Sequence, residues 1–258
     1  MEPRTRAAPV PAGGPSSTPS PRRVDRGLLA DLGLAAAGFL LYLAVRWWTL
    51  GRTDDAVSSA GDVLALEEVL GLDVEHTVQT ATYATAPWLG HAATHVYVWG
   101  YFPVLLAATA WLYLRHRDHY RTLRTALVVS GVLGLIVYAL YPVAPPWISD
   151  DRFADTVADA SLDVFVRPGP FMNELGAIPS FHCGWLTLAA VVVFGATRSR
   201  ALRVLCVALP LAMYVSVVVT GNHWTLDVPA GLAVAALGLF VASRLRAARH
   251  PAGDPGPG

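Results

Sequence analysis

The chain has 258 residues, of which 54% are hydrophobic and 15% charged, and its mean hydropathy is +0.44. Soluble domains carry about 25% charged residues, so this composition indicates a protein that folds in a lipid bilayer. The 19 acidic and 19 basic residues cancel, which argues against a nucleic-acid binder, and the absence of lysine excludes a Schiff-base or P-loop lysine mechanism.

Two terminal segments differ from the rest of the chain. Residues 1–26 are rich in proline, serine, glycine and arginine and contain no apolar run, which predicts a disordered cytoplasmic tail. Residues 249–258 have a similar composition and predict a second disordered tail. The segment between them, 27–248, is expected to form a single membrane domain.

Six apolar runs follow one another between the tails, each near the length that crosses a hydrocarbon core. They cover residues 28–48, 92–114, 125–142, 179–197, 204–221 and 226–243. The fold class is therefore expected to be all-α, a bundle of six transmembrane helices. Pro103 and Pro210 lie inside two of these runs, where proline is expected to kink a membrane helix rather than end it.

An acidic loop, residues 51–90, separates the first two predicted spans. Within it, residues 63–78 carry apolar side chains at helical spacing with acidic residues between them. The apolar positions are Leu66, Val69, Leu70 and Val74. This pattern predicts an amphipathic extracytoplasmic helix on the membrane surface, and a linker helix without a function explains it equally well.

The arginines predict the orientation of the spans. Fifteen of the 19 lie in the N-terminal tail and in residues 115–124, 198–203 and 244–249. With six spans these segments share one side, which the positive-inside rule makes cytoplasmic. Both termini are then cytoplasmic, and the loops 51–90 and 143–178 lie outside the cell membrane.

Tryptophan residues gather toward the outer ends of the spans. They are Trp47, Trp48, Trp88, Trp99, Trp147, Trp185 and Trp224. This distribution is typical of the aromatic belt at a membrane surface.

Three ionisable residues lie at the outer ends of the later spans. His182 is near the start of the fourth span, and His223 and Asp227 are near the start of the sixth, so one helical hairpin brings all three to the same depth. Ionisable residues in membrane segments cost roughly 2.5 to 3.5 kcal/mol each, which makes them functional candidates. Asp227 is four residues after His223, so on a helical turn the two side chains share a face and Asp227 can hold the imidazole of His223 in one tautomer. The alternative is that these residues are only polar caps at the membrane surface.

The sequence around these residues resembles a known enzyme superfamily. Residues 177–182, Ala-Ile-Pro-Ser-Phe-His, are similar to the Pro-Ser-x-His motif of the type-2 phosphatidic acid phosphatase superfamily. Residues 221–227, Gly-Asn-His-Trp-Thr-Leu-Asp, resemble its Gly-x-His-x-x-x-Asp motif. Residues 141–146, Tyr-Pro-Val-Ala-Pro-Pro, and residues 67–75, Glu-Glu-Val-Leu-Gly-Leu-Asp-Val-Glu, resemble more narrowly its inositolphosphotransferase-like branch, which includes inositol phosphorylceramide synthase. The resemblance covers about residues 28–245.

The resemblance implies a membrane phosphatase or phosphotransferase that works through a phosphohistidine without a metal or another cofactor. By position in the motifs, His223 would attack phosphorus, Asp227 would orient His223, and His182 would protonate the leaving alkoxide. Ser180, Gly221 and the free amides at the start of the fourth span would bind the phosphate oxygens. The implied substrate is a membrane lipid phosphate, with water or an alcohol such as a sugar or inositol as the acceptor.

The sequence departs from the superfamily pattern in its cations. The pattern has a lysine and an Arg-Pro pair at the end of the third span and an arginine six residues before the nucleophilic histidine. Here residues 138–146 contain no basic residue, and Val217 stands six residues before His223. Arg152 and Arg167 lie in the predicted outer loop that leads into the Pro-Ser-x-His motif. We therefore expect Arg152 or Arg167 to bind the phosphate.

Three other functions are consistent with parts of this pattern. A chain that has lost its phosphate-binding cations could keep the fold as a lipid-binding or assembly protein without catalysis. A transporter is less consistent with polar residues at one surface, because transporter sites lie near the midplane. His91 and His95 share a helical face and could join the other histidines in a zinc site, but an i, i+4 pair is a weak signal and we expect no metal.

Overall fold

The computed structural model describes residues 26–162 and 173–249. The two predicted tails therefore lie almost entirely outside the described residues. The chain divides into two compact units, residues 1–36 and 37–258, and the arrangement given below is that of the second unit. Within the described residues the structure consists of helices and connecting loops, with an isolated β-bridge and no strand.

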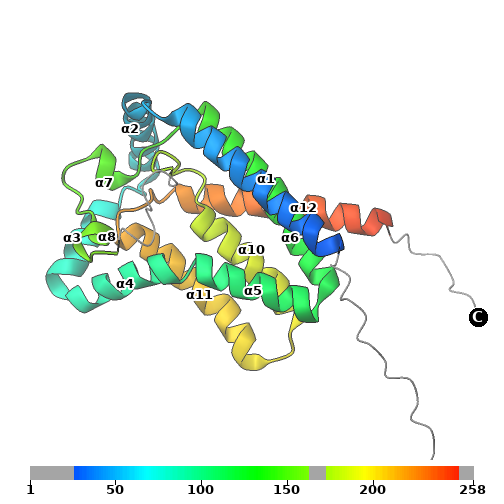
Figure 1. Ribbon diagram of the computed structural model, residues 1–258. Coiled ribbons are helices and arrows are strands. Elements are labelled where there is room, and N and C mark those ends of the chain that lie inside the picture. Colours follow the sequence, from blue (N-terminus) through cyan, green and yellow to red (C-terminus); the bar gives the residue numbers. More distant parts are fainter. Residues whose placement is uncertain (1–25, 163–172, 250–258) are drawn as a thin grey trace, which may run out of the picture. The chain divides into compact units, whose positions relative to one another are not determined.

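Helices make up most of the described chain, and Figure 1 labels them in chain order. Their bounds are α1 (Arg26–Thr49), α2 (Thr53–Leu70), α3 (Glu75–Thr85), α4 (Pro87–Trp99), α5 (Phe102–Arg115), α6 (Arg117–Leu140), α7 (Pro146–Ser149), α8 (Thr156–Asp159), α10 (Phe181–Ala196), α11 (Arg200–Val219) and α12 (Asp227–Arg249). α10 is the central helix of the second unit, where it contacts α5, α6, α11 and α12.

The structure contains four helices that are long and apolar enough to cross a membrane, among its described residues. They are α1, α6, α11 and α12, and the pair α4 and α5, bent by 44°, is a fifth candidate span if it crosses the membrane as one unit. The fourth predicted span, over residues 179–197, corresponds to α10. α10 has only 16 residues, which is about 24 Å of helix, because the polar residues at both ends of the predicted run lie outside it. The described part of the chain is thus all-helical with four or five candidate spans.

The two prolines inside predicted spans have different effects. Pro210 lies inside α11, and the helix continues through it as predicted. Pro103 was expected only to kink the second span, but α4 ends at Trp99 and α5 begins at Phe102. Proline has no backbone N–H and favours the first turn of a helix. The first helix therefore ends before Pro103, and Pro103 lies in the first turn of the next one.

The predicted surface helix over residues 63–78 is two helices rather than one. Gly71 adopts a left-handed conformation with φ of 67° and ends α2, because its N–H bonds to carbonyl oxygens of the last turn. The burial pattern also differs from that of a simple amphipathic helix, since Val69 is exposed whereas Glu67 and Glu75 are buried. α2 and α3 therefore direct two carboxyl groups toward the interior.

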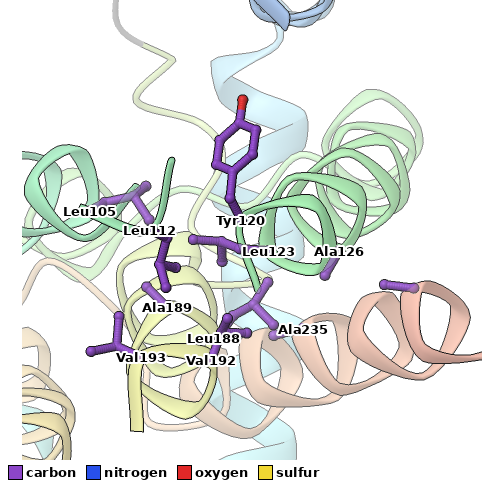
Figure 2. Close-up of a cluster of buried hydrophobic side chains, with 11 residues drawn as sticks. Leu105, Leu112, Tyr120, Leu123, Ala126, Leu188, Ala189, Val192, Val193 and Ala235 are labelled. Carbon is purple, nitrogen blue, oxygen red and sulfur yellow. The ribbon is translucent and has the colours of Figure 1, made fainter. Parts of the chain in front are cut away.

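A hydrophobic cluster joins four helices (Figure 2). Its buried members are Leu105, Leu112, Tyr120, Leu123, Ala126, Leu188, Ala189, Val192, Val193, Ala235 and Ala242. In Figure 2 side chains of α5, α6 and α10 converge on the space between these helices. Close packing of this kind fixes the helices relative to one another, and it therefore fixes where the first residues of α10 lie.

Two glycines let α10 and α12 approach closely near their first turns. A Cβ on Gly184 would lie 2.5 Å from the carbonyl oxygen of Gly231, and a Cβ on Gly231 would lie 2.2 Å from the carbonyl oxygen of Ser180. The backbone N–H of Ser180 also donates to the carbonyl oxygen of Asp227 over 3.1 Å. Small residues permit such close contacts between membrane helices, and this one brings the start of α10 against the start of α12.

Candidate active site

The turn between α11 and α12 carries the Gly-x-His-x-x-x-Asp residues. α11 ends at Val219, and Gly221 turns the chain with φ of 63°, a conformation that residues with a Cβ rarely adopt. A Cβ at Gly221 would also lie 2.9 Å from Nε2 of Gln79 and 3.1 Å from Cδ1 of Phe153. The turn therefore requires glycine for its conformation and for space, whether or not Gly221 also contacts phosphate.

His223 and Asp227 form the hydrogen-bonded pair that their spacing predicts. Nδ1 of His223 lies 2.9 Å from Oδ2 of Asp227 and 3.0 Å from the carbonyl oxygen of Ala177, and both side chains are buried. Both of these oxygens accept hydrogen bonds, so Nδ1 carries the proton and Nε2 keeps its lone pair. Oδ2 of Asp227 also accepts the N–H of Trp224 over 3.0 Å. Asp227 thus holds the tautomer in which Nε2 is the basic nitrogen.

Ser180 faces this basic nitrogen from the start of α10. Its hydroxyl oxygen lies 3.3 Å from Nε2 of His223, and the same oxygen caps α10 by accepting the N–H of Cys183 over 3.4 Å. Because the oxygen accepts from the amide, the hydroxyl proton is available to Nε2. The N-terminus of α10, whose first amides have no partners within the helix, therefore faces His223, and helix N-termini of this kind favour anions.

The ring of His182 lies beside that of His223. The two ring centroids are 5.5 Å apart, with 64° between the planes. Tyr97 stacks on the imidazole of His182, with ring centroids 4.5 Å apart, and the ring of Tyr101 lies against the same imidazole at a centroid distance of 4.3 Å. Tyr97 belongs to α4 and Tyr101 precedes α5, so the break between these helices lets two aromatic rings hold His182. Neither tyrosine was predicted as a site residue, because Pro103 was expected to kink a single span and not to separate two helices.

Trp224 supports the candidate site instead of joining the aromatic belt. Its side chain is 1% exposed, and its Nε1 donates to the carbonyl oxygen of Ala144 over 2.9 Å. Phe153 packs edge-on against the indole, with ring centroids 6.2 Å apart. Residues 141–146, Tyr-Pro-Val-Ala-Pro-Pro, are also hydrogen-bonded to the residues before α10, because the N–H of Ala177 donates to the carbonyl oxygen of Val143. That segment therefore packs against the histidine turn.

Two buried acids complete the surroundings of the turn. Oε1 of Glu67 accepts the N–H of Leu226 over 2.7 Å, and Oε1 of Glu75 accepts the N–H of Thr225 over 2.5 Å. Burial raises the pKa of Glu67 to about 8, and the neighbouring carboxyl group of Glu75 adds to this rise. The sequence predicted these acids on a surface helix, and the only signal of another role was their place at the two ends of the motif at residues 67–75.

Of the two arginines predicted to bind phosphate, only Arg152 is among the described residues, because Arg167 falls within 163–172. Arg152 is exposed, and its guanidinium binds Asp150, with Nη2 2.5 Å from Oδ2 and Nε 3.0 Å from Oδ1. These hydrogen bonds hold the pKa of Asp150 below its usual value. The next residue, Phe153, packs against Trp224 of the histidine turn, whereas the guanidinium of Arg152 is exposed and bound to Asp150.

The histidine pair considered for zinc lies on α4. His91 and His95 are both exposed, and His91 packs edge-on against Tyr83, with ring centroids 5.9 Å apart. Across residues 26–162 and 173–249, no group of three or more His, Cys, Asp or Glu side chains is placed to hold a metal ion.

The chain is similar to one known family of proteins. No curated protein and no solved structure matches the chain. The PAP2 superfamily matches residues 61–241, which is more than half of the chain and includes His182, His223 and Asp227. With its long apolar helices the chain is a multi-pass membrane protein, and by this match it belongs to the PAP2 superfamily.

Proposed function

We propose that the protein is an integral membrane enzyme that cleaves or transfers a phosphate-linked group of a lipid through a phosphohistidine. Its membership of the PAP2 superfamily supports phosphatase-type chemistry. The observation that carries the proposal is the geometry of His223: Asp227 holds its Nδ1, while its Nε2 faces Ser180 at the start of α10, with His182 alongside.

In the first half of the reaction, Nε2 of His223 attacks phosphorus. The bond from phosphorus to the oxygen of the lipid alcohol breaks as the bond to nitrogen forms, and the leaving oxygen takes a proton from protonated His182. Asp227 stabilises the positive charge that develops on the imidazole of His223. Ser180 and the first amides of α10 bind the phosphate oxygens.

In the second half, neutral His182 takes a proton from the acceptor. The acceptor oxygen attacks phosphorus, and the bond to Nε2 of His223 breaks, which restores the free imidazole. Water as the acceptor gives hydrolysis, and an alcohol gives a new phosphoester. Transfer to an alcohol such as inositol or a sugar is supported by residues 67–75 and 141–146, which resemble the inositolphosphotransferase-like branch and which both contribute contacts to the histidine turn.

The cation that offsets the phosphate charge is Arg152 or Arg167 in this proposal. The transferring group carries negative charge on its oxygens in the transition state, and a guanidinium can bind two of them at once. The chain neighbour of Arg152, Phe153, contacts Trp224 of the turn, and to bind phosphate the guanidinium of Arg152 would have to leave Asp150. Arg167 lies outside the described residues, and its assignment rests on its position in the sequence alone.

The proposed topology has six spans, in which the short helix α10 is the fourth span. Six spans place all four arginine-rich segments, from the N-terminal tail to the segment at 244–249, on one side of the membrane, which is the cytoplasmic side by the positive-inside rule. The candidate site, at the other ends of α10 and α12, then lies at the extracytoplasmic face of the cell membrane.

A second candidate is a lipid-binding protein without catalysis. The observations that favour it are Val217, at the position where the superfamily pattern has an arginine, and Arg152, whose guanidinium binds Asp150. Such a protein would bind lipid phosphates without turning them over.

The test is to incubate the purified protein in mixed micelles with a panel of radiolabelled lipid phosphates, with and without inositol or a sugar as acceptor. We expect release of water-soluble phosphate with at least one lipid, or transfer of the label to the acceptor, and we expect neither with the His223→Ala variant. The His91→Ala variant is the matched control and should keep full activity. Lipid binding without any turnover by the wild-type protein would instead support the non-catalytic candidate.

A further inference from the structure

The three backbone amides between His223 and Asp227 are all bound by carboxyl groups. The N–H of Trp224 donates to Asp227, the N–H of Thr225 to Glu75, and the N–H of Leu226 to Glu67. These amides immediately precede α12, where backbone N–H groups lack partners within the helix and where the helix dipole favours negative charge. Carboxyl groups from three elements therefore satisfy the amides of a single turn.

Glu67 and Glu75 come from outside the bundle that carries the histidines. Glu67 is in the last turn of α2 and Glu75 is the first residue of α3, and their exposed fractions are 0% and 1%. Their neighbours on the same segment, Glu68 and Asp73, are exposed. Because burying a carboxyl group is costly unless it is hydrogen-bonded, the contacts of these two acids with the turn account for their burial.

We propose that Glu67 and Glu75 are positioning residues that hold the turn between His223 and Asp227 in the geometry needed for nucleophilic attack. This inference rests on the proposed function of His223. It gives the outer helices α2 and α3 a role in catalysis, because a shift of either helix moves the turn and with it Nε2 of His223. A displacement of about 1 Å in an active site can lower a rate roughly a hundredfold.

Glu67 performs this role in its protonated form. The groups that face it are acids from two other elements, Glu75 at the start of α3 and Asp227 at the start of α12, and His223 is bonded to Asp227. Burial and these acids raise the pKa of Glu67 to about 8, so below that pH its carboxyl group is neutral. Its other oxygen, Oε2, is buried without a hydrogen-bond partner among the described residues, which also favours the neutral form. Above about pH 8 Glu67 becomes negatively charged beside Glu75 and Asp227. The repulsion between these carboxylates then weakens their hold on the turn between His223 and Asp227.

The pH dependence gives a readout that a purely structural role would not change. We expect kcat with phosphatidic acid in mixed micelles to fall as the pH rises through about 8 in the wild-type protein. Glu67→Gln keeps a neutral side chain that accepts from the N–H of Leu226, so it should retain most of kcat and lose the fall near pH 8, while the fall caused by loss of the proton on His182 remains. Glu67→Ala and Glu75→Ala should lower kcat roughly a hundredfold with little change in KM. Glu68→Ala and Asp73→Ala are the matched controls and should behave as wild type.

Hydrogen exchange at the turn separates this inference from the proposed function. We expect the amides of Thr225 and Leu226 to exchange faster in Glu75→Ala and Glu67→Ala than in wild type or in Glu68→Ala. Wild-type exchange rates in both alanine variants would overturn the inference, as would an unchanged alkaline fall in Glu67→Gln. If the wild-type protein shows no turnover, the proposed function fails and the catalytic role of the pair fails with it. Normal turnover with unaffected alanine variants would overturn only the positioning role.

Discussion

Asp227 contacts both the side chain of His223 and the backbone that carries it. Its Oδ2 accepts from Nδ1 of His223 and from the N–H of Trp224, and its own carbonyl oxygen accepts the N–H of Ser180. The same residue therefore sets the tautomer of the nucleophile and ties the histidine turn to the start of α10. Only the first of these roles depends on the charge of the side chain.

The Asp227→Asn variant should fold but lose most of its activity. An amide at this position can present its NH2 group to Nδ1, which favours the tautomer with the proton on Nε2 and removes the nucleophilic lone pair. Loss of the correct tautomer in the analogous Ser-His-Asp triad costs about 10⁴ in rate, and we expect kcat to fall by a similar factor. Circular dichroism and thermal unfolding should remain close to wild type. An activity within a few-fold of wild type would contradict this role.

Arginine variants test which cation binds the phosphate. Replacing the responsible arginine by alanine should lower kcat/KM strongly, and replacing it by lysine should restore only part, because lysine lacks the bidentate fork. The values of kcat/KM of Arg152→Ala and Arg167→Ala are compared. Arg121→Ala, on the predicted cytoplasmic side of the membrane, is the control. If both variants keep full activity, helix N-termini alone bind the phosphate and the cation assignment is wrong.

At the scale of elements, the close contact of α10 with α12 places the two histidine motifs together. Gly184 and Gly231 provide that contact, and the cluster in Figure 2 holds α10 from its other sides. The break between α4 and α5 has a similar role, since it lets Tyr97 and Tyr101 contact His182 together. Helix packing thus determines the distance between the imidazoles, which neither motif encodes by itself.

The Gly231→Ala variant should separate these helices. Its Cβ would lie 2.2 Å from the carbonyl oxygen of Ser180, so α12 has to move, and overpacking of this kind costs about 1 to 3 kcal/mol. We expect a lower melting temperature in detergent and a large fall in kcat. Gly38→Ala in α1, where nothing lies within 4 Å of the new Cβ, should not lower either quantity. Equal effects of the two variants would contradict the packing argument.

At the scale of the whole molecule, the proposed side of the membrane depends on whether α10 crosses it. Single cysteines can test this in a background without Cys183 and Cys206. Asp73→Cys should react with a membrane-impermeant maleimide in intact cells, whereas Arg198→Cys should react only after permeabilisation. Both positions are exposed, so a difference in labelling reports sidedness and not burial. Labelling of Arg198→Cys in intact cells would contradict a sixth span.

The sequence predicted those features that depend on local composition or on short motifs. Long apolar runs marked α1, α6, α11 and α12, and the spacing of His223 and Asp227 predicted their hydrogen bond. Features that depend on tertiary packing were missed. The burial of Glu67 and Trp224 depends on partners many residues away, Leu226 and Ala144. From the sequence alone, an acidic residue between apolar residues is assigned to the exposed polar face of a helix, because its distant hydrogen-bond partner is not known.

The most direct test of the central claim is to trap the phosphorylated enzyme. The purified protein would be incubated with a lipid phosphate carrying a labelled phosphorus, quenched in alkali, and digested to locate the label. We predict a label that is stable in base and labile in acid, located on His223, and absent from His223→Ala. A wild-type protein that turns over lipid phosphate without this label, or a His223→Ala variant that is still labelled and active, would contradict the account.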